Sequence, residues 1–468
     1  MQLDYFSAMF KVSIMTAKLI YTNMSIGRWI IYPSDCMNNN KVYAIVLVFV
    51  LVVAAAGAYF VFSSGNDDYR SSNTDGRLAI LGNADEDDYL DSKDIDKIKS
   101  MIENHEYSQM ADANNDGVVD DADAKMVQEI IDLKKYNKDK ADSEKKSMTI
   151  NYISVDNKVL LAEIPVLKLI ILNSQRSLSL AIAIDAGENV AALNDYIYTY
   201  WDENLFKNYK DLPTVGDRKE PSLEEILKTD ADTIYAGSET KYGVNIQGTA
   251  LGDKQVIRLV TYEDGRLADG ALMLGFFTDH DAEAQKYVKW MDDLTDKTNE
   301  KLSKIADKDK TRFYVGTPTY MYAGLDGVST ALSASGATNI GNLIITDPTK
   351  AGDSVSNHVE DILTYNPQYI VGGKYIYTHQ SESEIKAVYG SMDFSKFAIT
   401  DGYINNEICM INYDLPFCIH TLIGSTIFFP EAFSVAELED TIKEYLTLFC
   451  ETNGYEFNMY NFVYFPSD

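Results

Sequence analysis

The feature that most constrains this chain is an uninterrupted apolar run near its amino end. Residues 42–62 read VYAIVLVFVLVVAAAGAYFVF and contain no charged side chain. About 20 such residues cross a bilayer as an α-helix, and the run is too long for the core of an ordinary signal peptide. A buried core helix is a poor alternative because the run is apolar on every face. The sequence therefore predicts one transmembrane anchor.

The residues on either side of the run indicate its orientation. Lys41 precedes it and Asn66-Asp67-Asp68 follows it, so the positive-inside rule keeps the amino end in the cytoplasm. We expect a single-pass protein of the cell membrane, with residues 1–41 inside, a linker over 63–77 and the bulk of the chain outside. Met37 begins the segment MNNNK directly before the run and is an alternative start, in which case residues 1–36 are an over-extended gene prediction.

The composition excludes one class of partner. Asp and Glu total 71 against 41 Lys and Arg, a net charge of −30, so there is no basic surface for the phosphates of a nucleic acid. Cys36 lies before the apolar run, which leaves Cys409, Cys418 and Cys450 in the main body. An odd number cannot form a complete disulfide framework. Cys409 and Cys418 could pair across adjacent strands, and buried free thiols are the alternative.

Two acidic loops have the spacing of calcium ligands. In each loop oxygen-bearing side chains stand at positions 1, 3, 5, 9 and 12, and position 7 offers a backbone carbonyl. Calcium takes about six to eight oxygens, and ligands at alternate positions let a loop wrap around the ion. Gly117 suits the sharp turn at position 6 of the second loop, whereas Asp88 stands there in the first. The two predicted Ca²⁺ sites are Asn83, Asp85, Asp87, Tyr89, Asp91 and Asp94, and Asp112, Asn114, Asp116, Val118, Asp120 and Asp123.

Each loop is followed by apolar residues at helical spacing. The loop–helix pair repeats after 29 residues (position 83 to position 112), with Asp rather than Glu at position 12. Over residues 78–136 this arrangement resembles a dockerin domain. The resemblance implies either a cohesin-type partner protein or a module that only braces its neighbour. A solvated acidic linker is the alternative, and two such loops in tandem argue against it.

Beyond a charged linker over residues 137–147, short apolar runs alternate with amphipathic ones. This alternation predicts an α/β fold with parallel sheets covered on both faces. A long amphipathic stretch over 279–305 contains no Gly or Pro and divides the domain. We therefore expect a first lobe over 148–277, a connecting helix over 278–306 and a second lobe over 307–468. The expected strands are 166–172, 190–193, 233–236, 256–260, 312–315 and 369–371.

Three passages, in this order, resemble the substrate-binding proteins of metal-chelate ABC importers. They are Leu212–Gly216 with Pro221–Leu227 and Asp232–Tyr235, then the 279–305 stretch, then Val355–Ser356 with Val359–Leu363 and Asn366–Val371. The likeness covers roughly residues 150–468. It implies two Rossmann-like lobes joined by the connecting helix. It also implies a receptor that delivers an iron-siderophore chelate, haem or a corrinoid such as cobalamin to an ABC permease.

The same resemblance implies roles for two acidic residues. One acid from each lobe of these proteins reaches arginine pockets on the permease, and the matching positions are Glu224 and Glu360. Two separated carboxylates would fix the register of a docked body. The alternative is that each is an exposed acid favoured by the dipole in the first turn of a helix. Glu225 also competes with Glu224 for the role.

We expect the ligand between the lobes, on loops that follow the strands. These loops are rich in tyrosine, and aromatic faces suit a flat chelate while cations suit a carboxylate-bearing one. Because the chain has 32 tyrosines, many are ordinary core or surface residues. The candidate loops are 173–177, 196–201, 237–242, 317–322, 374–379 and 413–420, and the candidate ligand-binding residues are Arg176, Trp201, Tyr320, Tyr322 and Lys374.

The sequence contains no pattern of a known catalytic centre. It lacks the GxSxG elbow, the P-loop, HExxH and GxGxxG, and its five histidines form no i,i+4 pair. We therefore do not expect an enzyme. The favoured function is a solute receptor of an ABC importer. The alternative is a cell-surface adhesion or assembly protein that binds a cohesin partner through the dockerin-like module.

Overall fold

The structure is a computed structural model that describes residues 77–246, 248–260, 266–307, 310–324, 327–345, 355–373, 376–452 and 454–465. The expected anchor at 42–62, residues 1–41 before it and most of the 63–77 linker lie outside the described residues. Within the described ranges, no helix is both long enough and apolar enough to cross a membrane.

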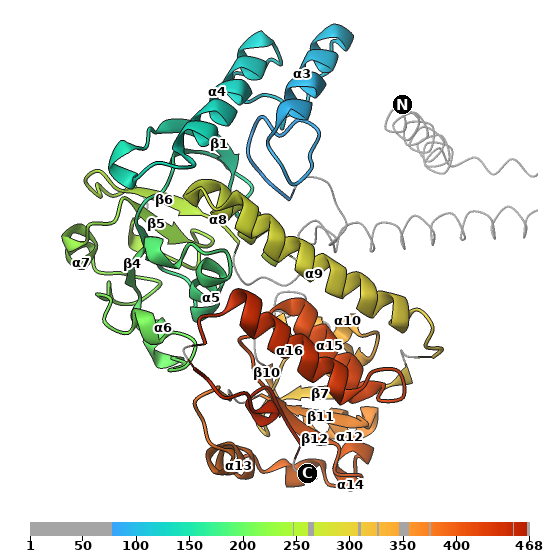
Figure 1. Ribbon diagram of the computed structural model, residues 1–468. Coiled ribbons are helices and arrows are strands. Elements are labelled where there is room, and N and C mark those ends of the chain that lie inside the picture. Colours follow the sequence, from blue (N-terminus) through green and yellow to red (C-terminus); the bar gives the residue numbers. More distant parts are fainter. Residues whose placement is uncertain are drawn as a thin grey trace, which may run out of the picture. The chain divides into compact units, whose positions relative to one another are not determined.

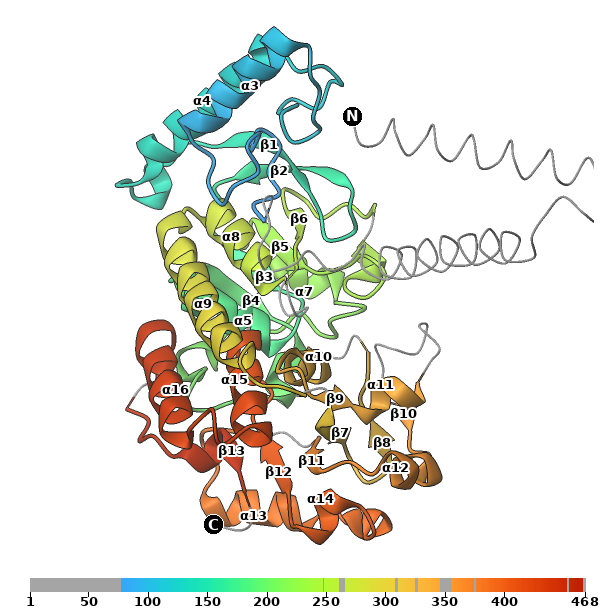
Figure 2. The ribbon, with the colours of Figure 1, turned by 90° about the vertical axis from the view of Figure 1, so that its right-hand side faces the viewer.

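Two helices follow the two acidic loops. Helix α3 (Ser92–Asn104) begins after the first loop and helix α4 (Asp121–Asn137) after the second. Each starts with a capping box, in which the aspartates at loop positions 9 and 12 accept hydrogen bonds from each other's backbone N–H. The two helices lie side by side (Figure 2). Their shared core consists of Ala84, Ile95, Ile98, Met101, Ala111, Ala113, Ala124 and Val127.

The chain before the first loop joins this module to the rest of the protein. Leu81 N donates to Asn151 O (3.0 Å), and Ile153 N donates to Ala79 O (2.8 Å). Those partners belong to strand β1 (Met148–Ile153), which pairs antiparallel with β2 (Val159–Ile164). The sequence did not predict this hairpin. Leu78, Ile80 and Ile130 of the module belong to the same apolar core as the lobes, so the module is packed onto the body.

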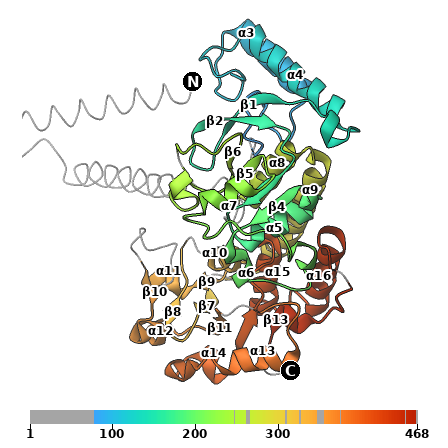
Figure 3. The same ribbon diagram turned by 90° about the vertical axis from the view of Figure 1, so that its left-hand side faces the viewer.

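The first lobe contains a four-stranded parallel sheet in the order β4-β3-β5-β6. Strands β3 and β5 are buried at every residue, as expected for parallel strands covered on both faces. The elements can be followed in Figure 3. They are β3 (Leu169–Ile171), α5 (Gln175–Ala183), β4 (Val190–Leu193), α6 (Asp195–Thr199), α7 (Leu223–Lys228), β5 (Thr233–Ala236), β6 (Gln255–Arg258) and α8 (Leu267–Thr278).

The long helix expected from the sequence is α9 (Asp281–Leu302), which connects the lobes (Figure 1). Its 22 residues span about 33 Å. Asp279 adopts a left-handed conformation (φ 60°) between α8 and α9. His280 N then donates to Gly275 O at 2.8 Å, which closes α8 and lets the chain turn before α9 begins.

The second lobe contains a mixed sheet rather than the purely parallel one that the sequence predicts. Its path is β10-β8-β7-β11-β12-β13, and β9 also pairs with β7. The antiparallel strands have only two residues each, too few to show an alternating pattern. The strands are β7 (Arg312–Gly316), β8 (Tyr320–Met321), β9 (Thr338–Asn339), β10 (Val355–Ser356), β11 (Tyr369–Gly372), β12 (Ile408–Ile411) and β13 (Val463–Tyr464). The helices are α10 (Gly327–Ala334), α11 (Ile340–Ile344), α12 (Val359–Tyr365), α13 (Glu382–Gly390), α14 (Asp401–Ile404), α15 (Phe417–Phe428) and α16 (Val435–Phe449).

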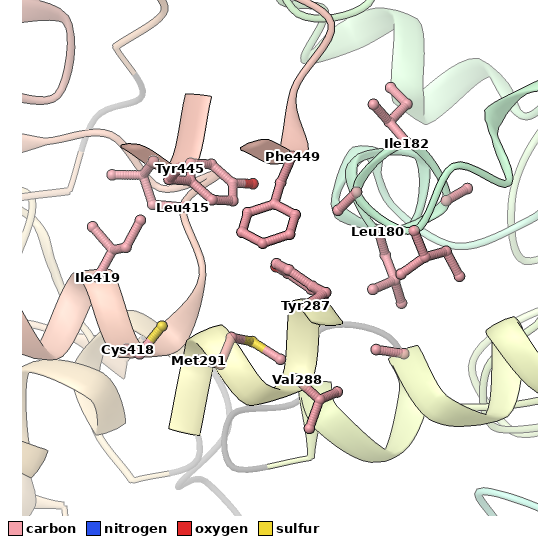
Figure 4. Packing of buried hydrophobic residues seen from close by; sticks show 14 of the residues in the cluster. Leu180, Ile182, Tyr287, Val288, Met291, Leu415, Cys418, Ile419, Tyr445 and Phe449 are labelled. Carbon is pink, nitrogen blue, oxygen red and sulfur yellow. The ribbon is translucent and has the colours of Figure 1, made fainter. Parts of the chain in front are cut away.

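One apolar core continues from the first lobe into the second. Figure 4 shows Leu180 of α5 and Tyr287 of α9 facing Phe449 of α16. The Tyr287 and Phe449 rings meet edge to face, with centroids 4.9 Å apart. Cys418 of α15 lies in the same cluster, and Cys409, Cys418 and Cys450 are all free thiols. Cys409 and Cys418 therefore do not pair in this structure.

Replacing Phe449 by alanine is expected to lower the free energy of unfolding by about 3–5 kcal/mol, because it leaves a cavity in the shared core. Unfolding of the full chain in denaturant measures this loss. Trp290, whose ring lies 5.3 Å from Phe449, gives a local fluorescence signal. The neighbouring Leu448 is 42 % exposed, so Leu448→Ala should change stability by less than about 0.5 kcal/mol. Equal losses in both variants would contradict this assignment.

Candidate functional site

Three loops of the first lobe leave the carboxyl ends of neighbouring parallel strands. Asn173 follows β3, Tyr196 follows β4 and Tyr242 follows β5. Asn194 Nδ2 donates to Ile171 O (3.0 Å) and to Asn173 O (2.9 Å), which holds the first two loops together. A Cβ atom on Gly237 would lie 2.7 Å from the Tyr242 ring and 3.0 Å from Asn173 Oδ1. The side chains of the first and third loops therefore meet over this glycine.

Arg218 lies against the second and third of these loops. Its guanidinium carbon is 3.5 Å from the centroid of the Tyr196 ring and 5.6 Å from that of Tyr242. Both distances are within the range of a cation–π contact. Tyr196 also hydrogen-bonds to Tyr200, and their ring centroids are 4.6 Å apart. Burial raises the pKa of Tyr196 to about 12, so its hydroxyl stays protonated.

The second lobe adds Tyr377, which follows β11. Burial raises its pKa, and Asp414, Tyr200 and Asp202 raise it further. The next residue, Thr378, donates two hydrogen bonds to Asp202 of the first lobe, which places Tyr377 at the contact between the lobes. We refer to Tyr196, Tyr200, Arg218, Tyr242 and Tyr377 as the tyrosine–arginine cluster. Tyr322, after β8, and Tyr413, after β12, make a separate edge-to-face pair with centroids 6.5 Å apart.

Asp202 of the first lobe makes the most buried polar contact between the lobes. It is 1 % exposed and accepts hydrogen bonds from Thr378 N (2.7 Å) and Thr378 Oγ1 (2.5 Å) of the second lobe. It also accepts from Asn204 N at 3.0 Å within its own loop. His379 Nδ1 lies 3.8 Å from the same carboxylate, and this contact raises the pKa of His379.

A second polar contact between the lobes involves the start of α5. Gln175 Nε2 donates to Asp414 Oδ1 at 2.7 Å, and Arg176 Nη2 donates to Tyr413 O at 2.6 Å. Burial raises the pKa of Asp414 to about 6, although Arg176 and Gln175 partly counteract it. Several enclosed polar atoms of this turn have no hydrogen-bond partner within the described part of the chain. They are both amide atoms of Asn173, the hydroxyls of Ser174 and Ser177, and Gln175 Oε1.

Unpartnered polar atoms in a protein interior call for a partner from outside the chain. These four residues are at least nine-tenths buried, and their segment follows β3 at the edge of the sheet where the loops converge. Ligands of open α/β sheets bind outside the carboxyl ends of the strands. The β3–α5 turn and the tyrosine–arginine cluster are therefore the candidate ligand site.

Two cavities are less suitable for a chelate. One has about 30 Å³, room for little more than a water molecule. It is lined by Arg176 and Asp414 of the second polar contact between the lobes, and by Leu180, Tyr287 and Tyr445 of the apolar core in Figure 4. The other has about 270 Å³ and is lined by Lys145, Asp232 and Gln255 among others. It lies at the amino ends of β5 and β6, the opposite edge from that used by ligands in such sheets.

The candidate ligand-binding residues lie in different surroundings. Arg176 lies in the first turn of α5, shortly after β3, and Tyr322 directly follows β8. Trp201 stacks on Tyr198, with centroids 5.2 Å apart, and donates from Nε1 to Glu203 at 3.1 Å. Tyr320 is 47 % exposed within β8. Lys374 lies outside the described residues. Arg218 was not among the candidates, although it follows Gly216 of the first family-like passage.

The two acidic loops of the module are closed by their own hydrogen bonds. Asp112 accepts from Asp116 N (3.0 Å) and Gly117 N (2.8 Å), and Asp123 accepts from Asn114 N (3.1 Å) and Asp120 N (2.9 Å). In the first loop, Asp94 accepts from the N–H groups at positions 3 and 9, which parallels Asp123. Both loops thus turn their position-12 carboxylate inward.

These loops fit a calcium ion in part. Asn83 Oδ1 at position 1 is buried without a hydrogen-bond partner, and Asp94, Asp112 and Asp123 are at most 1 % exposed. Buried carboxylates with few donors are costly unless a cation compensates them. However, among the described residues no three His, Cys, Asp or Glu side chains come together closely enough to hold a metal. The position-12 carboxylates and Asn83 Oδ1 are oxygen donors of the kind that Ca²⁺ takes.

Comparisons with known proteins agree with this geometry. Residues 170–388 match the family model of the periplasmic binding protein. This part of the chain is thus similar to periplasmic binding proteins. That family comprises binding proteins rather than enzymes, in agreement with the expectation from the sequence. A search of the curated proteins finds no match.

Solved structures show that the periplasmic-binding-protein fold extends over both lobes. The TroA-like periplasmic binding protein FepB of Veillonella parvula is 15 % identical, with a TM-score of 0.52, and the match covers 66 % of this chain and 97 % of that one. Molybdate-bound MolA of Haemophilus influenzae is 12 % identical, with a TM-score of 0.53, over 66 % and 99 % of the two chains. A solute-binding protein of V. parvula is 12 % identical, with a TM-score of 0.52, over 67 % and 95 %.

Asp202→Asn is expected to weaken the contact between the lobes. Hydrogen bonds to a charged group contribute about 1.5–3 kcal/mol each. The free energy of unfolding at pH 7 should therefore be about 1–3 kcal/mol lower in the variant. Burial opposes ionisation of Asp202, but the neighbouring His379 and the hydrogen bonds from Thr378 outweigh it and lower the pKa of Asp202. The stability from the carboxylate is therefore present above about pH 4 and is lost as the pH falls through the lowered pKa.

Denaturant unfolding of wild type and Asp202→Asn over pH 3–8 measures this effect. The difference between the two should be largest between about pH 4 and 6. It should shrink below about pH 4, and it should also fall as the pH rises through the raised pKa of His379, because the imidazole then loses the charge that faces Asp202. Glu203→Gln, at the exposed neighbouring position, is the control and should have little effect at any pH. A difference that persists undiminished at pH 3 would show that the Asp202 carboxylate does not act in this way.

Proposed function

We propose that this chain is an extracytoplasmic solute receptor that captures a metal chelate and delivers it to an ABC importer. The observation that carries this proposal is the convergence of strand-end loops from both lobes on the tyrosine–arginine cluster and the β3–α5 turn. The molybdate periplasmic binding protein MolA, which shares the fold, belongs to an ABC transporter. The anchor expected at residues 42–62 would keep the receptor near its permease.

The ligand that we propose is an iron chelate, haem or a corrinoid. Tyr196, Tyr200 and Tyr377 are all partly exposed and come from both lobes, so their ring faces and hydroxyls are available to a ligand. Aromatic faces provide large, rigid contact areas, and a few polar groups then fix the orientation of the ligand. This combination suits an organic chelate better than a bare metal ion.

We further propose that Glu224 and Glu360 dock on the permease. Both are exposed and lie in the first turns of α7 in the first lobe and α12 in the second. Lys228 forms ion pairs with Glu224 (2.8 Å) and with Glu225 (2.9 Å), and it lowers the pKa of Glu224. Exposed pairs of this kind contribute little to stability, so Glu224 can exchange Lys228 for an arginine of a partner.

For the module we propose two Ca²⁺ ions and a bracing role. Arg77 pairs with Asp88 of the first loop and, through Nη1, with both carboxylate oxygens of Asp292 on α9 (3.0 and 2.9 Å). Lys134 of α4 donates to Phe276 O (2.7 Å) and to Asp281 Oδ2 (2.8 Å). These contacts favour a module fixed to the body over the adhesion alternative, in which it binds a cohesin-type partner.

Ligand binding is tested by thermal unfolding of the full chain with ferric siderophores, haem and cobalamin. We expect one class to raise the melting temperature, because a ligand that binds only the folded state stabilises it, by about 2.7 kcal/mol at a concentration 100 times Kd. A matched sample of hen-egg lysozyme controls for nonspecific effects. No shift with any member of the panel would argue strongly against a receptor for chelates.

The calcium sites are tested by the same melting experiment with added Ca²⁺ or EDTA. We expect Ca²⁺ to raise the melting temperature of the transition that involves the module. Asp123→Ala should abolish this shift, because it removes a buried oxygen donor of the second loop. Asp121→Ala, at the exposed position 10 of the same loop, should leave it intact. A melting profile indifferent to EDTA would refute the calcium proposal.

A further inference from the structure

The two acidic loops of the module differ at position 6. The second loop has Gly117 there, with a positive φ of 90°, and a Cβ atom built on it would meet no described atom within 4 Å. The first loop has Asp88, whose side chain is 24 % exposed. Asp88 Oδ1 accepts from Arg77 Nε at 2.9 Å, and Oδ2 accepts from Arg77 Nη2. The same position is therefore free in the second loop and engaged in the first.

Arg77 extends this contact to the connecting helix α9. Its Nη1 donates to both carboxylate oxygens of Asp292, at 3.0 and 2.9 Å, so one guanidinium binds two carboxylates. Gln285, two helical turns before Asp292 and on the same face of α9, donates from Nε2 to Asp88 O in a long contact of 3.5 Å. The first loop is thus seated on one face of α9 through both the side chain and the carbonyl of Asp88.

The connecting helix also carries the core that joins the lobes. Tyr287 and Met291 of α9 belong to the apolar cluster in which Phe449 of the second lobe packs (Figure 4). A contact that holds α9 from the side of the first loop therefore acts on the element that links the two lobes.

The second loop makes a different contact with the body. Its aspartates accept hydrogen bonds from N–H groups of the loop itself. Its residue Ala113 accepts from Asn151 Nδ2 at 3.0 Å, which ties it to the β1–β2 hairpin and not to α9. The first loop is therefore the one through which the module grips the connecting helix.

We infer that Asp88 and Arg77 form a latch through which calcium binding at the first loop and the seating of the module on α9 strengthen each other, whereas the second loop binds its ion independently of α9. Asp88 stands between Asp87 and Tyr89, two of the predicted ligands, so a fixed Asp88 also fixes the backbone that positions them. A loop that is ordered in advance loses less conformational freedom when it binds.

Coupling of this kind is reciprocal. If the latch raises the affinity of the first loop for Ca²⁺, then Ca²⁺ must stabilise the seated module by the same factor. The inference rests on the proposed calcium sites and specifies which of the two acts on the receptor body. It also gives a role to the aspartate that suits position 6 of a calcium loop poorly.

The test titrates Ca²⁺ into the calcium-free full chain by calorimetry. Asp292→Asn removes the latch carboxylate on α9, and Asp293→Asn removes the same charge at the next position. Asp293 is the control because its side chain is 65 % exposed and pairs with Lys289 of its own helix at 2.8 Å. Asp94→Asn and Asp123→Asn each remove the position-12 carboxylate of one loop and so assign the binding steps. The melting temperature without Ca²⁺ checks that each variant is folded.

We expect Asp292→Asn to weaken Ca²⁺ binding at the first loop about fivefold or more, the lower end of typical coupling between sites. Binding at the second loop should change less than about twofold, and Asp293→Asn should change either site less than about twofold. Hydrogen exchange gives the reciprocal readout. Ca²⁺ should slow the exchange of backbone amides in the first half of α9 in the wild type, and it should do so less in Asp292→Asn.

Three results would overturn the latch while leaving calcium binding intact. One is a first loop with the same affinity in the wild type and in Asp292→Asn. Another is an equal loss in Asp292→Asn and Asp293→Asn, which would reflect the charge of α9 rather than the contact with Arg77. The third is binding of Ca²⁺ at the second loop alone. If the wild type binds no Ca²⁺ at either loop, the calcium proposal itself fails and the latch fails with it.

Discussion

The apolar contact among α5, α9, α15 and α16 is the interaction on which the rest of this structure depends. It joins the two lobes through one continuous core, in which Leu180, Tyr287 and Phe449 come from three different helices. Each buried side chain of this kind contributes about 1.5–3 kcal/mol, and close-packed interiors resist displacement. The core therefore fixes how the strand-end loops of one lobe face those of the other.

The polar contacts between the strand-end loops depend on the spacing that the core fixes between the two lobes. Asp202 reaches Thr378, and Gln175 reaches Asp414, at distances of 2.5 to 2.7 Å. A shift of one lobe by 1 Å would break these hydrogen bonds, because they weaken steeply beyond about 3.2 Å. The unpartnered atoms of Asn173 and Ser174 lie beside these contacts in the β3–α5 turn. The lobe interface thus combines satisfied hydrogen bonds, which set its geometry, with unsatisfied groups that a ligand can use.

The sequence indicates the strand-end loops more directly than it indicates the contacts of single side chains. Buried strands such as Thr233–Ala236 stand out as apolar runs, and the loops after them follow from the rule that ligands bind at strand ends. Trp201 was chosen for its aromatic surface, yet it stacks on Tyr198. Arg218 follows no strand, and only the fold brings it to Tyr196. The mixed second sheet was missed because its two-residue strands leave no periodic pattern.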